Sequence, residues 1–171
     1  MSGMADVYRA PMRSRSNEID WRATLERALR LGLCGFGRLV RNAAEEERLA
    51  RRVDRFAALP EGSFVWTRDQ DRLFWLGRVA GPYFRDEDPG AVAVDLVHVR
   101  RCTWLAEPLL ESGAPAAVVA TFGRGGRNFQ QTHHRSVSQE TQHIGTQGSR
   151  RTKSASRAGA PVAADARRAT R

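Results

Sequence analysis

The N-terminal half of the chain carries apolar residues at the spacing of an amphipathic helix. Trp21, Leu25 and Leu29 recur every four residues, which places their side chains on one helix face. Asp20 is of the type that caps a helix N-terminus, and Gly32 is of the type that ends a helix. The pattern therefore predicts a helix that begins after Asp20 and ends before Gly32.

A second helical stripe follows after a glycine-rich connection. Leu49, Val53 and Phe56 recur at intervals of four and three residues, and Pro60 comes shortly after them. This spacing predicts a helix over about residues 44–59, which ends before the proline.

Beyond residue 62 the pattern shortens to runs rich in Val, Phe and Trp, which are favoured in strands. Acidic turns are expected between the first and second strands and before the third. A short helix is expected after the last strand. Helices followed by adjacent strands predict an α+β fold, with a curved, mostly antiparallel β-barrel and flanking helices. The expected strands are residues 63–68, 73–80, 91–105 and 116–122, the turns 69–71 and 86–90, and the helix 137–144.

The two ends of the chain lack these patterns. Residues 1–18 mix Ser, Arg, Met and Pro without periodicity, and residues 145–171 are mainly Ser, Arg, Ala and Gly. Such segments bury too little apolar surface to fold. We therefore expect a flexible leader over residues 1–18, one binding domain over residues 19–144, and a disordered basic tail over residues 145–171.

The formal charge of +9 is concentrated near the C-terminus. Residues 124–171 hold ten of the 28 Lys and Arg and two of the 19 Asp and Glu, a net charge of +8, which leaves +1 for residues 1–123. A nearly neutral body excludes nucleic-acid binding by bulk electrostatics alone, but it is compatible with a local basic groove.

The cysteines and the hydropathy indicate in which cellular compartment the protein is expected. Cys34 and Cys102 lie in apolar surroundings without a CxxC spacing, which indicates reduced core residues. No apolar run approaches the length of a membrane span. We expect a cytoplasmic protein that does not enter a membrane.

The sequence contains no recognisable catalytic or metal-binding motif. His133 and His134 are adjacent, so they would point apart on a strand, and Lys153 lacks the Asp and Glu partners of a nuclease centre. We therefore predict a binding module that is not an enzyme and that uses neither a cofactor nor a metal.

Aromatic and basic residues concentrate in and around the predicted strands. A few rings and guanidinium planes at the mouth of a pocket would stack on an unpaired or extruded base; alternatively, the same rings fill the core of a small barrel. The candidate base-binding residues are Phe36, Trp66, Trp75, Arg78, Tyr83, His98, Arg100, Trp104 and Arg124.

The order of several short motifs points to one family. The motifs are GFG at 35–37, GSFVWTRD at 62–69, LGRVAGPY at 76–83, VDLVHVRRCTWL at 94–105 and FGRGGRNFQQ at 122–131. Together they resemble the PUA-like reader domains. These include the EVE-type modules and the DNA-reading modules attached to modification-dependent restriction endonucleases.

The resemblance implies a strongly curved sheet closed by helices around a pocket for a modified base such as a methylated cytosine. The family's glycine motif often carries Trp where this chain has Phe36, Gly37 and Arg38. The implied function is to read a modified or flipped base, in DNA rather than RNA, for bacterial defence or restriction. A separate nuclease is the possible partner.

A protein-interaction or regulatory domain without a nucleic-acid ligand is the alternative. The two hypotheses differ in the surface that they require. A reader needs a concave pocket lined by at least two aromatic side chains and one Arg, whereas an interaction domain needs a flat apolar patch.

Overall fold

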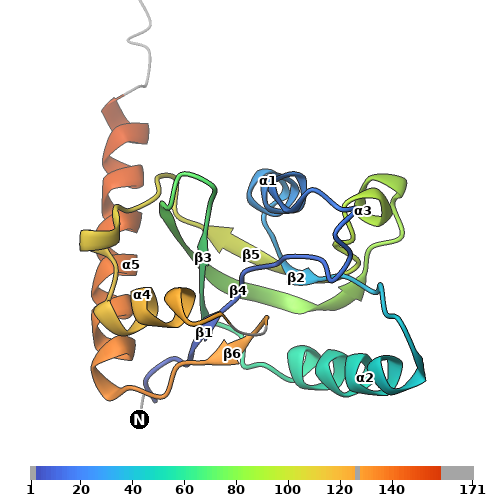
Figure 1. Cartoon of the computed structure of the whole chain (residues 1–171). Helices are drawn as coiled ribbons and strands as arrows, with labels where there is room; N and C mark the ends of the chain where they lie inside the picture. The colour runs from blue at the N-terminus through green and yellow to red at the C-terminus, as the bar shows by residue number, and fades with distance from the viewer. Residues whose placement is uncertain (1–2, 126–127, 159–171) are drawn as a thin grey trace, which may run out of the picture.

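The computed structural model describes residues 3–125 and 128–158. Its centre is a single sheet with helices on both faces (Figure 1). The strands are β1 (Val7–Arg9), β2 (Leu33–Phe36), β3 (Phe64–Arg68), β4 (Phe74–Arg85), β5 (His98–Trp104) and β6 (Gln130–Gln131). The helices are α1 (Trp21–Leu31), α2 (Ala43–Ala57), α3 (Pro89–Ala93), α4 (Ala116–Gly123) and α5 (Arg135–Ala158), with a 3-10 turn at Glu111–Gly113.

The strand order is β2-β5-β4-β3-β1-β6. β1 runs parallel to β3, and the other neighbouring strands are antiparallel. This confirms an α+β fold with a mostly antiparallel sheet. The predicted barrel is not formed, because the sheet is open: its outer strands β2 and β6 have only four and two residues, too few to pair around a closed cylinder.

The local signals of α1 are confirmed. The Asp20 side chain accepts a hydrogen bond from the Arg22 N–H (3.0 Å), and the helix ends at Gly32, which is in the left-handed conformation. Its buried residues include Leu25 and Ala28, which pack against the sheet.

The alternation of side chains along the strands divides the core into two clusters. One face of the sheet packs against α1 and α2, and includes Val65 of β3 and Val79 of β4. The other face packs against α4 and α5. Its buried residues include Phe64 and Trp66 of β3 and Phe74 of β4.

The predicted flexible leader is wrong from residue 7 onward. Val7 pairs with Phe64 and Arg9 with Trp66, so β1 is an inner strand between β3 and β6. Ala10 and Met12 are also buried. Three strand residues are too few for a periodic pattern, which is why this element gives no signal in the sequence.

Two of the predicted strands are also wrong. Residues 116–122 form α4, with Val118 and Phe122 on its buried side. A short apolar run suits a buried helix as well as a strand, so periodicity cannot separate the two. The run 91–105 begins in α3 and becomes a strand only at His98.

The predicted disordered tail is corrected over residues 145–158, because α5 continues to Ala158. A Cβ added at Gly148 would lie 2.8 Å from Leu105 Cδ1, so the helix backbone presses directly on the body of the domain. A Cβ added at Gly145 would lie 3.3 Å from Phe64 Cε1, so this part of the helix backbone also lies close to the body. Residues 159–171 lie outside the described residues. No helix in the described part of the chain is long and apolar enough to cross a membrane.

This packing predicts that a chain ending at Ile144 is less stable than the full chain. Removing the second half of α5 exposes Phe64 and Leu105, which Gly145 and Gly148 cover. The loss of buried apolar area should lower the melting temperature by a few degrees. Thermal unfolding followed by circular dichroism measures it, and an unchanged melting temperature would show that the second half of α5 does not stabilise the body.

Candidate functional site

A pocket of about 360 Å³ lies where segments that are distant in the sequence meet. It is lined by the segment after β1, the end of β2, the first two thirds of α2 and the ends of β3 and α4. Its volume is within the range of small-ligand sites. The side chains and backbone that line it are Arg9, Pro11, Arg13, Ser14, Arg15, Phe36, Gly37, Leu39, Val40, Glu45, Leu49, Arg52, Arg68, Asp95, Phe122, Gly125 and Asn128.

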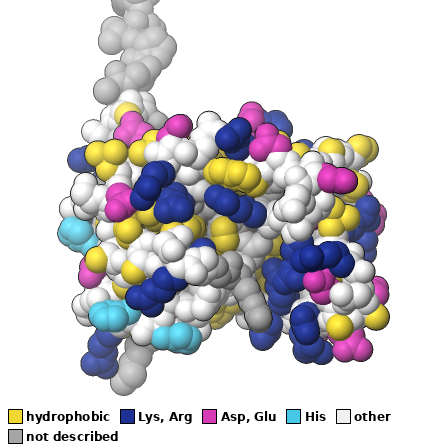
Figure 2. Space-filling view, viewed as in Figure 1, with side chains coloured by type: hydrophobic (Ala, Val, Ile, Leu, Met, Phe, Trp, Pro, Cys, Tyr) yellow, Lys and Arg dark blue, Asp and Glu magenta, His cyan; other side chains and the backbone are white. Residues whose placement is uncertain are grey.

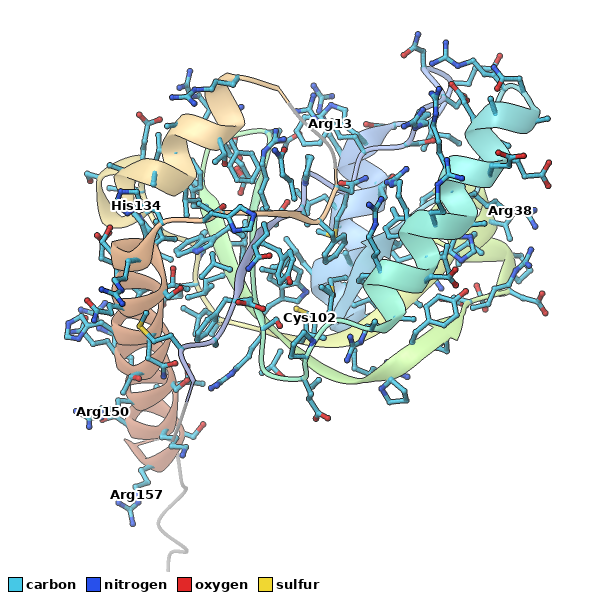
Figure 3. The ribbon with its side chains drawn as sticks, turned by 90° about the horizontal axis from the view of Figure 1, so that it is seen from below. Arg13, Arg38, Cys102, His134, Arg150 and Arg157 are labelled. Carbon is cyan, nitrogen blue, oxygen red and sulfur yellow. The ribbon has the colours of Figure 1, made fainter. Side chains whose placement is uncertain are left out.

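The pocket is rich in arginine. Five Arg side chains line it, against two carboxylates. In Figure 3, Arg13 is seen between α4 and α2. Figure 2, which views the molecule from another side, shows Lys and Arg side chains over α2 and near the centre of that face. The local charge is therefore much more positive than the near-neutral total for residues 1–123 suggests.

Both carboxylates of the pocket are engaged by the protein. Glu45 forms ion pairs with Arg15 (3.4 Å) and Arg41 (3.6 Å), and accepts a hydrogen bond from the Arg41 N–H (2.9 Å). The pKa of Glu45 is lowered, mainly by this backbone hydrogen bond and also by the neighbouring Arg charges. Asp95 is only 2% exposed and is held by three donors.

Asp95 connects three segments of the chain at the floor of the pocket. Its Oδ1 accepts hydrogen bonds from the backbone N–H groups of Arg38 (2.8 Å) and Leu39 (3.4 Å), and its Oδ2 accepts one from the Ser14 hydroxyl (2.5 Å). A Cβ added at Gly37 would lie 2.0 Å from Asp95 Oδ2, so only glycine fits there. Asp95 thereby fixes the backbone of residues 37–39 against the pocket.

Phe36 forms the aromatic wall on the β2 side. Its ring centroid lies 5.2 Å from that of Phe56 and 5.7 Å from that of His98, and the Arg52 guanidinium lies over the ring at 4.7 Å. A buried ring backed by two others is held in one orientation. Because Phe36 is only 2% exposed and Arg52 covers its ring, the planar group that this wall offers to a flat ligand is the Arg52 guanidinium, with the Phe36 ring behind it.

Phe122 is the second aromatic residue that lines the pocket. It packs edge-on against Phe74, with the ring centroids 5.6 Å apart. The guanidinium groups of Arg9 and Arg68 both lie over the Phe122 ring, at 4.8 Å and 5.6 Å from its centroid. The pocket thus contains two aromatic rings and several planar cations.

Phe36 is the one sequence-predicted site residue that lines this pocket. Tyr83 and His98 lie behind it: the Tyr83 hydroxyl and His98 Nδ1 are 2.8 Å apart, and their rings are stacked. Arg100 is buried and donates to the carbonyls of Gly81, Phe56 and Leu59, so it fixes the end of α2 to β4. These three residues support the pocket wall.

Five further predictions do not lie at the pocket. Trp66 is fully buried in the core against α5, and Arg124 is exposed after α4. Trp75 and Trp104 line a separate groove of about 740 Å³ beside α1, together with Trp21. Arg78 lines a third groove, of about 440 Å³, against α5. The alternation along strands does not reveal which face of the sheet carries a site, so these residues were wrongly grouped.

Sequence reasoning missed most of the pocket. Several of its residues lie in or next to the segment that was expected to be a flexible leader, and others sit at strand ends or in a run expected to be a strand. A basic N-terminal segment was the only signal for the first group. The missed residues are Arg9, Arg13, Ser14, Arg52, Arg68, Asp95, Phe122 and Asn128.

The described residues contain no group of three or more His, Cys, Asp or Glu that could hold a metal ion. Cys34 and Cys102 are free and buried, as predicted. Burial raises the pKa of the Cys102 thiol, and its neighbour Cys34 adds to the effect. The Cys102 thiol is therefore an uncharged core group.

His98 predicts a specific pH dependence of stability. Burial lowers the pKa of His98 below its ordinary value of 6.5, and Arg85 contributes in the same direction. The unfolded chain then binds more protons than the folded chain once the pH falls below about 6.5, so the free energy of unfolding decreases there and is flat above it. Urea unfolding of the wild type and of His98→Gln at about pH 5.5 and 7.5 measures this difference, and an equal pH dependence in both proteins would contradict it.

No family model matches the chain. No curated protein matches it either. The solved structures that are similar to it include two that match 84% of its length. One is the YTH domain of the Zygosaccharomyces rouxii MRB1 protein in complex with N6-methyladenosine RNA, with 12% identity, a TM-score of 0.42 and 86% of that chain covered.

The other is the Pho92 YTH domain in complex with m6A, with 10% identity, a TM-score of 0.46 and 85% of that chain covered. With TM-scores below 0.5, these similarities assign neither a family nor a ligand to this chain. The likeness to PUA-like domains stays a resemblance of sequence motifs.

Proposed function

We propose that this domain is a nucleic-acid reader that holds one base, modified or extruded from its stack, in the pocket between Phe36 and Phe122. One observation supports this most strongly. A single concave pocket combines two aromatic rings with five Arg side chains, and both of its carboxylates already have protein partners. An anionic ligand with a flat aromatic part fits that combination.

Stacking is the first element of recognition. The Phe36 ring and the Arg52 guanidinium form a wall that is held from behind by Phe56 and His98. Bases stack on aromatic rings and on guanidinium planes, with a contribution of about 1–3 kcal/mol per base. A base gains that energy by stacking on the Arg52 guanidinium, and it reaches the Phe36 ring itself when the Arg52 side chain moves aside, since Phe36 is 2% exposed beneath it.

Hydrogen bonding to the base edge is the second element. An ionised carboxylate has about four lone-pair sites, and Asp95 uses three of them for Ser14, Arg38 and Leu39. The remaining site accepts a hydrogen bond from an exocyclic amino group. Because Asp95 is held rigidly at the floor, it accepts a hydrogen bond only from an amino group at one position. A base whose amino group lies elsewhere or is blocked should therefore bind more weakly.

We extend the proposal to the finer points that the sequence resemblance implies. The ligand is DNA rather than RNA, the base carries a modification such as a methyl group, and the role is in bacterial defence or restriction with a separate nuclease as partner. The domain itself is a binding module and not an enzyme. A cytoplasmic location, where Cys34 and Cys102 stay reduced, goes with this role.

An equilibrium titration tests the function. Fluorescently labelled DNA and RNA oligonucleotides of one sequence, each with and without a single methylated base, are titrated with the full chain at fixed salt. Selective binding supports the reader, and a preference for DNA supports the finer proposal. Equal affinity for modified and unmodified strands of both kinds would exclude a modified-base reader.

The tryptophan groove gives specific support to the alternative function in protein interaction. Trp21, Trp75 and Trp104 are partly exposed along this groove of about 740 Å³, and Leu25 and Leu29 lie between them. Aromatic side chains are enriched at protein interfaces. If the titration shows no nucleic-acid binding, this groove is the surface on which the alternative rests.

A further inference from the structure

Arg9 stands out because two of its three guanidinium nitrogens are buried without a hydrogen-bond acceptor. The residue is only 5% exposed, and its Nε and Nη1 atoms have no hydrogen-bond partner in the structure as described. A buried charged donor without a partner is costly, so such a group is expected to have one in the functional state of a protein. Arg9 lines the pocket between Phe36 and Phe122, which is where that partner would enter.

The position of Arg9 is fixed by the sheet. Its backbone pairs with Trp66 of β3 on one side and with Gln130 of β6 on the other. The side chain then lies over Phe122, with its Cζ 4.8 Å from the ring centroid. The guanidinium is therefore held in place before any ligand arrives, which lowers the entropic cost of binding.

Two more arginines line the pocket. Arg68 lies over the same Phe122 ring at 5.6 Å, whereas the guanidinium of Arg13, in the segment after β1, lies over the Trp21 ring at 4.1 Å. Among the described residues, none of these three forms an ion pair with Asp or Glu. The pKa of Arg9 is lowered, first by burial and then by the charges of Arg68 and Arg13. The positive charges of these three arginines repel one another until an anion neutralises them.

We propose that Arg9, together with Arg68 and Arg13, binds the phosphodiester next to the base that occupies the pocket. This inference rests on the proposed function, and it specifies the ligand further. The anion in question is a phosphate group, which the planar guanidinium contacts with two parallel N–H bonds. The pocket then recognises a nucleotide within a strand, with the base on the Phe36 side and its phosphate on the Phe122 side.

Replacing a charged phosphodiester of the oligonucleotide with a neutral group tests the phosphate contact directly. Oligonucleotides with one methylated base carry either a phosphodiester or a neutral methylphosphonate at the linkages that flank this base. The wild type should bind the neutral strand at least about tenfold more weakly, as expected for the loss of a charge-assisted hydrogen bond. Arg9→Gln should bind the charged strand about as weakly as the wild type binds the neutral one, and should lose little more on the neutral strand.

Arg157→Gln is the matched control, because it removes the same charge at the end of α5 remote from Arg13 (Figure 3). It should keep the full wild-type sensitivity to the neutral linkage. The inference is overturned if Arg9→Gln is as sensitive to the neutral linkage as the wild type. If the proposed reader function itself is wrong, the result is different. Neither the wild type nor any of the variants would then distinguish the methylated strand from the unmodified one.

Arg68→Gln provides a second variant, because Arg68 is less buried than Arg9 and its replacement leaves β1 intact. Inorganic phosphate, compared with chloride at the same ionic strength, should raise the melting temperature of the wild type and not that of Arg9→Gln or Arg68→Gln. A rise of equal size in all three proteins would contradict a phosphate site at Arg9. If Arg9→Gln does not fold, Arg68→Gln decides the linkage experiment by the same criteria.

Discussion

Replacing Trp66 with alanine should lower the free energy of unfolding by about 3–5 kcal/mol, the range for truncating a large buried aromatic residue. Trp66 is fully buried on the face of the sheet that packs against α4 and α5. Its indole N–H donates to the Thr141 hydroxyl of α5 at 3.2 Å. The variant would leave a cavity and a buried hydroxyl without its donor. Chemical denaturation followed by circular dichroism gives the size of the effect.

Trp66→Phe serves as a control, since it keeps most of the volume and removes only the hydrogen bond to Thr141. It should lower the free energy of unfolding by clearly less than Trp66→Ala does. Neither variant should change selectivity for a modified base as long as the protein is folded. A stable Trp66→Ala protein that has lost its selectivity would instead return Trp66 to the binding site that the strand pattern first suggested.

Replacing Phe36 with leucine should weaken binding of the preferred oligonucleotide by about 1–3 kcal/mol, which is roughly five- to 150-fold. Leucine keeps an apolar side chain against Phe56 and His98 but offers no ring face. The cost in stability should stay below about 1.5 kcal/mol if the core repacks. Binding titrations and unfolding curves on the same preparation separate the two effects.

Phe64→Leu is the matched control for this experiment. Phe64 is also a buried phenylalanine, but it lies in the other core cluster, it is absent from the pocket lining, and its neighbours include Arg78 and Gly145. The substitution should lower stability and leave affinity unchanged. Equal losses of affinity in Phe36→Leu and Phe64→Leu would mean that the loss reflects general destabilisation and that no base stacks at Phe36.

The elements that sequence reasoning found are those with strong local signals. The helix α1 has a cap at Asp20, a four-residue apolar repeat and a terminating glycine, and all three are present in the structure. The β3–β4 hairpin was also recognised, since its strands are rich in aromatic residues and its turn at Asp69 is acidic. The Asp69 side chain accepts hydrogen bonds from the N–H groups of Asp71 and Leu73, as turn residues do.

The elements that were missed depend on tertiary contacts. β1 has three residues and is defined by its pairing with β3 and β6. α4 is apolar on most sides, so its sequence does not distinguish a helix from a buried strand. The second half of α5 is polar apart from its glycines, and it is the close approach at Gly145 and Gly148 that places it against the body.

The nine site residues predicted from the sequence are all aromatic or basic, but only Phe36 among them lines the pocket. The arginines of the pocket include Arg9, Arg13, Arg52 and Arg68. Which face of a strand a ring occupies, and which loop folds over a strand end, depends on the whole topology.

Chemical-shift mapping by NMR locates the bound base without any substitution in the protein. The ¹⁵N-labelled chain is titrated with the methylated oligonucleotide that binds most tightly. A base in the pocket should produce the largest backbone shifts at residues 36–39 and at Asp95, with the indole signals of Trp75 and Trp104 unmoved. Largest shifts at those indoles, with residues 36–39 unaffected, would contradict this prediction and place the ligand in the tryptophan groove.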